Sequence, residues 1–163
     1  KTILGAGFVL IFTIPMVRIL INSGVNASDL VSMPVAMAQF VADGVGGVYP
    51  FFAPAVGALG AFIAGSNTVA NLMLADFQFN VAQQLGVSTA MMVSLQAVGA
   101  AAGNMIAIHN VVAASATVGL LGREGITIRK TILPTIYYLI FTGIIALIAF
   151  YVIGVTDPLM RAG

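Results

Sequence analysis

The sequence predicts an all-α membrane protein that crosses the bilayer several times. Its 163 residues are 60% hydrophobic and 7% charged, whereas a soluble domain carries about 25% charged residues. The ranges 44–75, 77–122 and 131–156 contain no Lys, Arg, Asp or Glu. Because a spanning helix needs roughly 20 apolar residues, each of these ranges is long enough to contain one.

Charge and residue usage narrow the functional classes. The net charge is only +1, so no nucleic-acid partner is indicated. The absence of cysteine excludes disulfides and thiolate metal sites. One histidine and five scattered acidic residues suggest neither paired catalytic carboxylates nor a metal cluster, so we predict no enzymatic activity, cofactor or metal. The chain begins at Lys1 without an initiator methionine, and we expect it to be the C-terminal part of a longer protein.

The first 50 residues divide into a span and a shorter segment. Residues 1–29 are predicted to hold the first transmembrane span and a polar turn. Residues 30–50 are predicted to form an interfacial helix and a linker, because the helical part, 30–43, is too short to cross the bilayer.

Residues 51–86 are predicted to form a re-entrant hairpin, which enters the membrane and returns to the same side. Its first arm, 51–65, would be about 22 Å long at 1.5 Å per residue, which is shorter than the roughly 30 Å hydrocarbon core. Small residues recur every four positions in this arm and allow another helix to approach closely. The second arm, 69–86, carries a polar face that is unsuited to lipid: Asp76, Asn80, Gln83 and Gln84. The triplet 66–68 would form a non-helical tip, which is tolerated where protein buries it or water reaches it.

Residues 87–121 are predicted to form a discontinuous transmembrane helix. Gly103 and Asn104 interrupt the helix about midway, which leaves two halves over roughly 88–101 and 105–120. Two breaks in one short chain, at the hairpin tip and here, are typical of a transporter site.

The remaining residues fix the predicted orientation. Residues 122–130 are predicted to be a cytoplasmic loop, because Arg123, Arg129 and Lys130 concentrate there and positive residues favour the cytoplasmic side. Residues 131–163 are predicted to form the last transmembrane span and a C-terminal tail. The hairpin would then open to the outside.

The polar triplet Ser66-Asn67-Thr68 has two interpretations. Its oxygens could accept bonds from the first amides of the next helix, since Ser, Asn and Thr are preferred N-cap residues. Alternatively, those amides and the positive end of the helix dipole could face an anion. Because a second break occurs at Gly103–Asn104, the sequence favours a binding site.

Two ionisable residues are candidates for carrying a proton. His109 is the only histidine, and histidine titrates near physiological pH. A histidine that only hydrogen-bonds between helices is an equally good interpretation. Asp76 is the rival candidate, unless it lies at the water interface and merely solvates the outer end of the hairpin.

Several motifs occur together and in order. The run FFAPAVGALGAFIAGSNTVANLM precedes LQAVGAAAGNMIAIHNVVAASATVGLLGREGITIRKT, which leads into LPTIYYLIF. These runs closely resemble the C-terminal part of bacterial L-lactate permeases. That family is similar in turn to the wider ion-transporter superfamily, which includes the divalent-anion/sodium symporters.

The resemblance implies the second inverted repeat of an elevator-type carrier. Such a carrier would import lactate, and glycolate, together with protons, as a multi-pass protein of the bacterial inner membrane. The resemblance implies substrate contacts from the tip and the unwound segment: Ser66, Asn67, Thr68, Gly103 and Asn104. Further expected partners are the lipid bilayer and the N-terminal repeat of the same carrier, while a homo-oligomer is left open. A sodium-coupled carboxylate symporter is the alternative. A channel subunit ranks below it, because no carbonyl filter or ring of charges is present.

Overall fold

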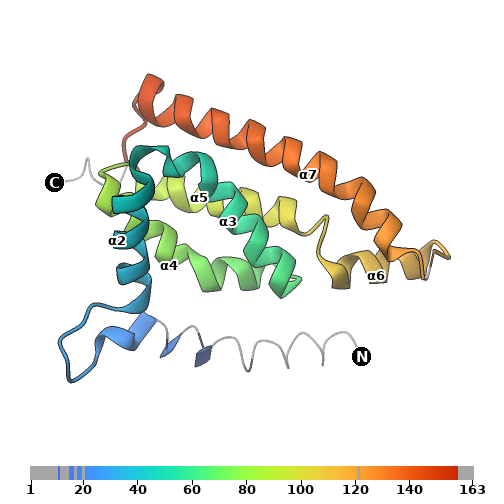
Figure 1. Cartoon of the computed structure of the whole chain (residues 1–163), viewed down its shortest axis with the longest axis horizontal. Helices are drawn as coiled ribbons and strands as arrows, with labels where there is room; N and C mark the ends of the chain where they lie inside the picture. The colour runs from blue at the N-terminus through green and yellow to red at the C-terminus, as the bar shows by residue number, and fades with distance from the viewer. Residues whose placement is uncertain (1–10, 12–14, 17, 20, 121, 158–163) are drawn as a thin grey trace.

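The computed structural model describes residues 11, 15, 16, 18, 19, 21–120 and 122–157, and its regular elements there are all helical (Figure 1). The predicted first transmembrane span, within 1–29, lies mostly outside the described residues. The elements are η1 (Asn22–Gly24), α2 (Met33–Val45), η2 (Gly46–Val48), α3 (Tyr49–Ala64), α4 (Asn67–Leu85), α5 (Thr89–Gly103), α6 (Ile108–Thr117), α7 (Glu124–Leu147) and the π-helix η3 (Ile148–Ile153). The all-helical fold class is therefore confirmed for this part of the chain.

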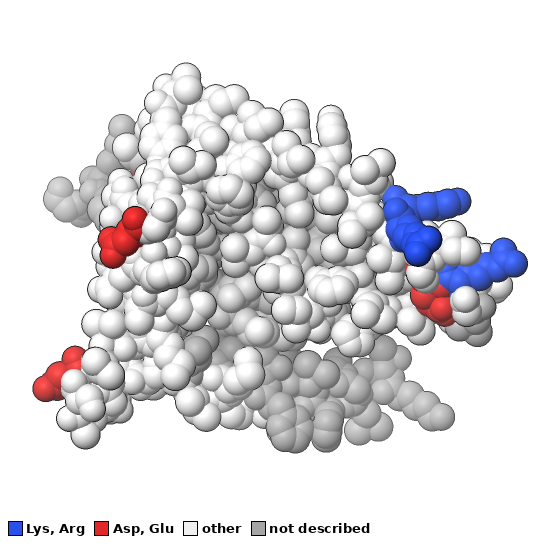
Figure 2. All heavy atoms as spheres, in the orientation of Figure 1, with Lys and Arg blue, Asp and Glu red and all other residues white. Residues whose placement is uncertain are grey.

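Two stretches of the described chain are long and apolar enough to cross a membrane. They are Met33–Ala64 and Glu124–Ile153, and α5 with α6 makes a third if this pair, bent by 42°, is one span. In Figure 2, the Lys and Arg side chains that are visible on this face lie at one end, whereas the broad middle of the face carries no charge. This distribution is compatible with a membrane protein whose middle lies among lipid tails.

The helices α3, α4 and α5 form the centre of the fold. α3 and α4 fold back on each other, and α5 packs against both (Figure 1). Glycines allow the approach of α3 to α5: a Cβ on Gly57 would lie 2.9 Å from Ala100 N, and one on Gly99 would lie 2.6 Å from Pro54 Cα. Almost one turn further along α3, a Cβ on Gly60 would lie 3.3 Å from Ala70 Cβ on α4. The predicted close approach of helices along these small residues is confirmed.

A buried polar network ties the same three helices together. Tyr49 Oη donates to Gln78 Oε1 at 2.8 Å, and Gln78 Nε2 donates to Gln96 Oε1 at 3.1 Å. Gln78 Nε2 also reaches the carbonyl of Ala53 at 3.3 Å. Both glutamines are 0% exposed. Their amides therefore hold α3, α4 and α5 in one register, since an unpaired polar group in an apolar interior is costly.

The predicted 122–130 loop is shorter in the structure, because α7 begins at Glu124. Glu124 lies in the first helical turn, where a carboxylate is favoured by the helix dipole. Its Oε1 also accepts from the amide of Gly122 at 2.9 Å. Arg129 and Lys130 consequently lie on the helix rather than in a loop.

The discontinuous helix is also interrupted at slightly different residues than predicted. α5 continues through Gly103, and α6 begins only at Ile108. Gly103 stays helical because its backbone packs on α3: a Cβ there would lie 2.7 Å from Ala58 Cα. The unwound residues are therefore 104–107.

Candidate functional site: the hairpin turn and the helix break

The turn between α3 and α4 is only two residues long. Gly65 ends α3 in the left-handed conformation, with φ 66° and ψ 14°, which glycine adopts without steric cost. Ser66 is extended and caps α4, its Oγ accepting from Val69 N at 3.4 Å. The prediction that 66–68 are all non-helical is thus wrong for Asn67 and Thr68, because the Ser66 cap starts the helix directly after itself.

The capping interpretation therefore holds for Ser66, but the cap does not satisfy all the amide donors at the start of α4. The amides of Asn67 and Thr68 belong to the first helical turn and have no intrahelical partner. The Thr68 side chain is exposed, and that of Asn67 is partly buried. Asn67 Oδ1 accepts from Asn71 Nδ2 at 3.0 Å, and Asn71 Oδ1 is buried without a partner in the described structure. The start of α4 thus offers free N–H groups at the positive end of a helix.

The break between α5 and α6 runs beside the last turns of α3. Gly103 lies against Ala58, as described above, and His109 lies against Gly65. Within the break, Asn110 Nδ2 donates to the Asn104 carbonyl at 3.3 Å and to its Oδ1 at 3.4 Å. Asn104 is thereby engaged in holding the bent backbone, and Gly103 presents its open side to α3 rather than to a cavity.

His109 is the side chain that joins the two breaks. A Cβ on Gly65 would overlap His109 Nδ1 and would lie 3.0 Å from Cγ and 3.1 Å from Cε1. The imidazole therefore rests on the turn, immediately before Ser66 and the first amides of α4. His109 is nevertheless exposed as a residue, so a small molecule could reach it at the turn.

Asp76, the rival candidate, lies elsewhere. It is partly buried on α4, nine positions beyond Asn67, where Asn80 Nδ2 donates to its carbonyl at 2.7 Å and to its Oδ2 at 3.3 Å. About 13 Å of helix separates nine residues. The structure therefore brings His109, but not Asp76, to the hairpin turn.

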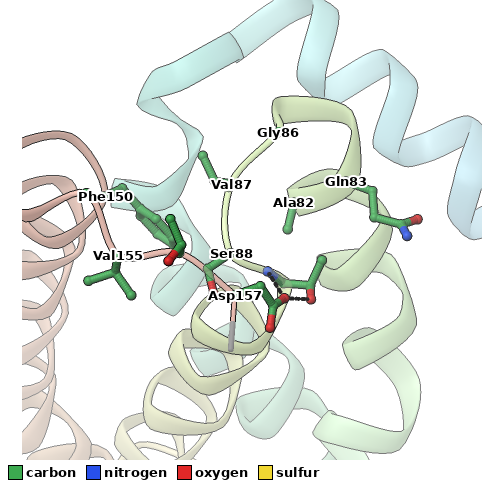
Figure 3. A pocket seen from close by; sticks show the side chains of 11 residues that line it. Ala82, Gln83, Gly86, Val87, Ser88, Phe150, Val155 and Asp157 are labelled. Carbon is green, nitrogen blue, oxygen red and sulfur yellow. Dashed lines mark hydrogen bonds between the residues drawn. The ribbon is translucent and has the colours of Figure 1, made fainter. Parts of the chain in front are cut away.

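A cavity of about 590 Å³ lies at the opposite end of the hairpin, and sequence reasoning missed it. Figure 3 shows Asp157, from the segment after η3, lying over the start of α5. Its Oδ2 accepts from Thr89 N at 3.1 Å and from Ala90 N at 3.4 Å, and also from Thr89 Oγ1. Two polar pairs could have indicated this contact: Ser-Thr at 88–89 and Thr-Asp at 156–157. Nothing in the sequence shows that they meet.

The arrangement at the turn suits a small carboxylate. Free amides at a helix start are a common anion site, and the neighbouring imidazole can add a hydrogen bond or a positive charge. Within the described residues, no cluster of three or more His, Asp or Glu side chains could hold a metal ion.

Comparison with known proteins gives a consistent set of relatives. The family model described as L-lactate permease matches residues 1–153. A Haemophilus influenzae protein, whose name also refers to an L-lactate permease, is 38% identical over 137 residues, which are 84% of this chain and 24% of that protein. The L-lactate permease of Escherichia coli is 35% identical over 108 residues (66% of this chain, 20% of its own). A glycolate permease of the same organism is 36% identical over 109 residues, with shares of 67% and 20%.

These relatives are much longer than the chain, which spans about a fifth to a quarter of their length. No solved structure matches the chain.

Proposed function

The chain belongs to the L-lactate permease family, and we propose that it forms part of a carrier that imports lactate, and glycolate, together with protons. Relatives named for lactate and for glycolate support this substrate class. Both compounds are small 2-hydroxy monocarboxylates, so one site that holds the carboxylate and tolerates a difference of one methyl group can accept both.

The contact between His109 and the hairpin turn carries the proposal. It puts the one histidine of the chain against Gly65, the residue directly before the Ser66 cap of α4. We assign the carboxylate to the backbone and side chains of Ser66, Asn67 and Thr68, with Gly103 and Asn104 holding the broken helix beside them. Hydrogen bonds to a charged group are worth about 1.5–3 kcal/mol each, so a few such donors can hold a carboxylate.

Proton coupling is assigned to His109 ahead of Asp76. Histidine is a common proton carrier in proteins, and His109 contacts the hairpin turn that forms the proposed carboxylate site. Asp76 is separated from that site along α4 and already interacts with Asn80. A sodium-coupled symporter is the second candidate, because carbonyls of broken helices can coordinate sodium.

The proposed architecture is the second inverted repeat of an elevator-type carrier in the bacterial inner membrane. The hairpin of α3 and α4 would re-enter the bilayer from the outside, and the Arg123, Arg129 and Lys130 end would face the cytoplasm. The tight packing of α3, α4 and α5 supports their movement as one body. The remaining repeat of the carrier would cover the exposed side of the turn.

The test is lactate uptake by the full-length protein in liposomes. We expect saturable uptake driven by an inward proton gradient, with no requirement for sodium. Uptake driven by a sodium gradient alone would favour the second candidate, and uptake that does not saturate would point to a channel.

A second measurement separates the two proton candidates. His109→Gln should retain lactate counterflow, which needs no net proton movement, and lose accumulation driven by the pH gradient. Asp76→Asn should retain both. If the two variants behave in the opposite way, the proton assignment moves to Asp76.

A further inference from the structure

We propose that Gly65 is a positioning residue: it lets the His109 ring rest on the hairpin turn, so that a proton on this ring and a carboxylate at the start of α4 stabilise each other. The inference rests on the proposed proton-linked carboxylate transport. Gly65 contributes to that function because it has no side chain, which leaves room for the His109 ring. The contact also explains why proton and substrate would bind together.

The contact depends on the missing Cβ of Gly65. A Cβ there would overlap Nδ1 of His109 and approach Cγ to 3.0 Å and Cε1 to 3.1 Å. Ordinary carbon contacts lie at about 3.5–4.0 Å, so the imidazole occupies the space that a side chain would fill. The ring would have to move by at least about 0.5 Å to accommodate a methyl group.

Within the described residues, no hydrogen bond or ion pair holds the His109 ring. Few titratable groups lie on the helices packed around the ring. α3 carries Tyr49, α4 carries Asp76, α5 carries none, and α6 carries only His109 itself. On α7, which packs against α6, the charged or titratable side chains are Glu124, Arg129, Lys130, Tyr137 and Tyr138. None of these groups pairs with the imidazole. A proton on His109 therefore gains a neighbouring negative charge when a carboxylate binds at the start of α4.

This geometry makes the two binding events mutually dependent. Opposite charges within about 4–6 Å favour each other's charged forms. Coupling of this kind is reciprocal: the factor by which the proton raises carboxylate affinity equals the factor by which the carboxylate raises proton affinity. Displacing the ring from Gly65 weakens both effects at once.

The chain provides a matched control in Gly86, which ends α4 as Gly65 ends α3. Its φ is also 66°, with ψ 28°, and a Cβ on Gly86 would meet nothing within 4 Å. Gly65→Ala and Gly86→Ala therefore force alanine into the same left-handed backbone conformation. Only Gly65→Ala also displaces the imidazole.

The experiment measures lactate uptake by the full-length carrier in liposomes over a series of external pH values. We expect Gly86→Ala to keep the wild-type pH profile. Gly65→Ala should lower proton-driven uptake about tenfold or more and flatten the profile, since misplacing a functional group by about 1 Å can cost about a hundredfold in rate. In a His109→Ala background, measured by counterflow, adding Gly65→Ala should cost no more than adding Gly86→Ala, because residues that act through one contact are not additive.

The proposal is overturned if Gly65→Ala and Gly86→Ala show the same uptake and pH profile, or if the effect of Gly65→Ala persists in full without the histidine. Should Gly65→Ala fail to reach the membrane, the double variant Gly65→Ala/His109→Ala must restore its level, because it removes the clash; failure to do so also overturns the proposal. Failure of the proposed function would appear separately, as a wild-type protein that takes up no lactate.

Discussion

The α3–α4 hairpin has two polar regions, and they differ in how their hydrogen-bonding groups are satisfied. In the network of Tyr49, Gln78 and Gln96, the side chains are buried and bond to one another across three helices, and only Gln96 Nε2 lacks a partner in the described structure. At the turn, Thr68 is exposed, and the first amides of α4 have no intrahelical partner. The first set of polar residues therefore holds helices together, and we propose that the second set binds a ligand.

We expect the largest effect from replacing Gln78, the side chain at the centre of the buried network. Gln78→Leu leaves the Tyr49 hydroxyl and Gln96 Oε1 without their partner, and each such buried group costs about 1–3 kcal/mol. We expect thermal unfolding in detergent to show a loss of about 2–6 kcal/mol. Gln84→Leu, at an exposed position of the same helix, should change stability little.

The apolar triple variant Tyr49→Phe/Gln78→Leu/Gln96→Leu provides a further check. Replacing every partner by an apolar group can be nearly neutral, so this variant should recover part of the stability that Gln78→Leu loses. A triple variant less stable than the single one would contradict the network's role.

The second prediction concerns the turn. Asn67→Ala in the full-length carrier should reduce lactate affinity by about tenfold to over a hundredfold, the equivalent of roughly 1.5–3 kcal/mol. Its level in the membrane should stay near wild type. Loss of the bond from Asn71 Nδ2 to Asn67 Oδ1 should lower its stability by only about 1 kcal/mol. Lactate binding and uptake measured beside Gln84→Ala test this prediction. Unchanged affinity would leave the triplet with a capping role alone.

The third prediction has the smallest effect and compares two caps. Ser66 Oγ accepts from Val69 N at 3.4 Å, and Ser88 Oγ accepts from Met91 N at 3.3 Å. Replacing either serine by alanine should cost about 1 kcal/mol of stability, seen as similar shifts in thermal unfolding. Transport should fall further for Ser66→Ala than for Ser88→Ala. Equal losses of transport would show that both serines act only as caps.

The local features of the fold could be predicted from the sequence. Short helices, the polar triplet and the Gly103–Asn104 pair indicated a hairpin and a broken helix, and the structure has helix ends at both places. Two helices begin earlier than predicted. α4 begins at Asn67 because Ser66 caps it, and α7 begins at Glu124, whose carboxylate is favoured in the first turn. Such shifts of a few residues depend on side-chain geometry that a hydrophobic pattern does not contain.

Contacts between distant segments could not be predicted. The polar face expected on α4 contained Asp76, whereas the residue that became buried was Gln78, because α5 brings Gln96 to that side. His109 was a candidate because it is the only histidine of the chain and because an ionisable residue in an apolar range indicates function. Its position on Gly65 follows from how α5 packs along α3, and no local pattern encodes this packing.

The cap on α5 has a consequence for how the protein is made. α5 begins at Thr89, but the carboxylate that receives its first amides is Asp157, 68 positions later in the chain. A ribosome must therefore finish α7 and η3 before that helix start can be closed. Until then, the amides of Thr89 and Ala90 must find water or another partner. The hairpin and α5 are translated before Asp157. A nascent chain arrested before residue 157 would therefore contain these helices without the carboxylate that caps α5.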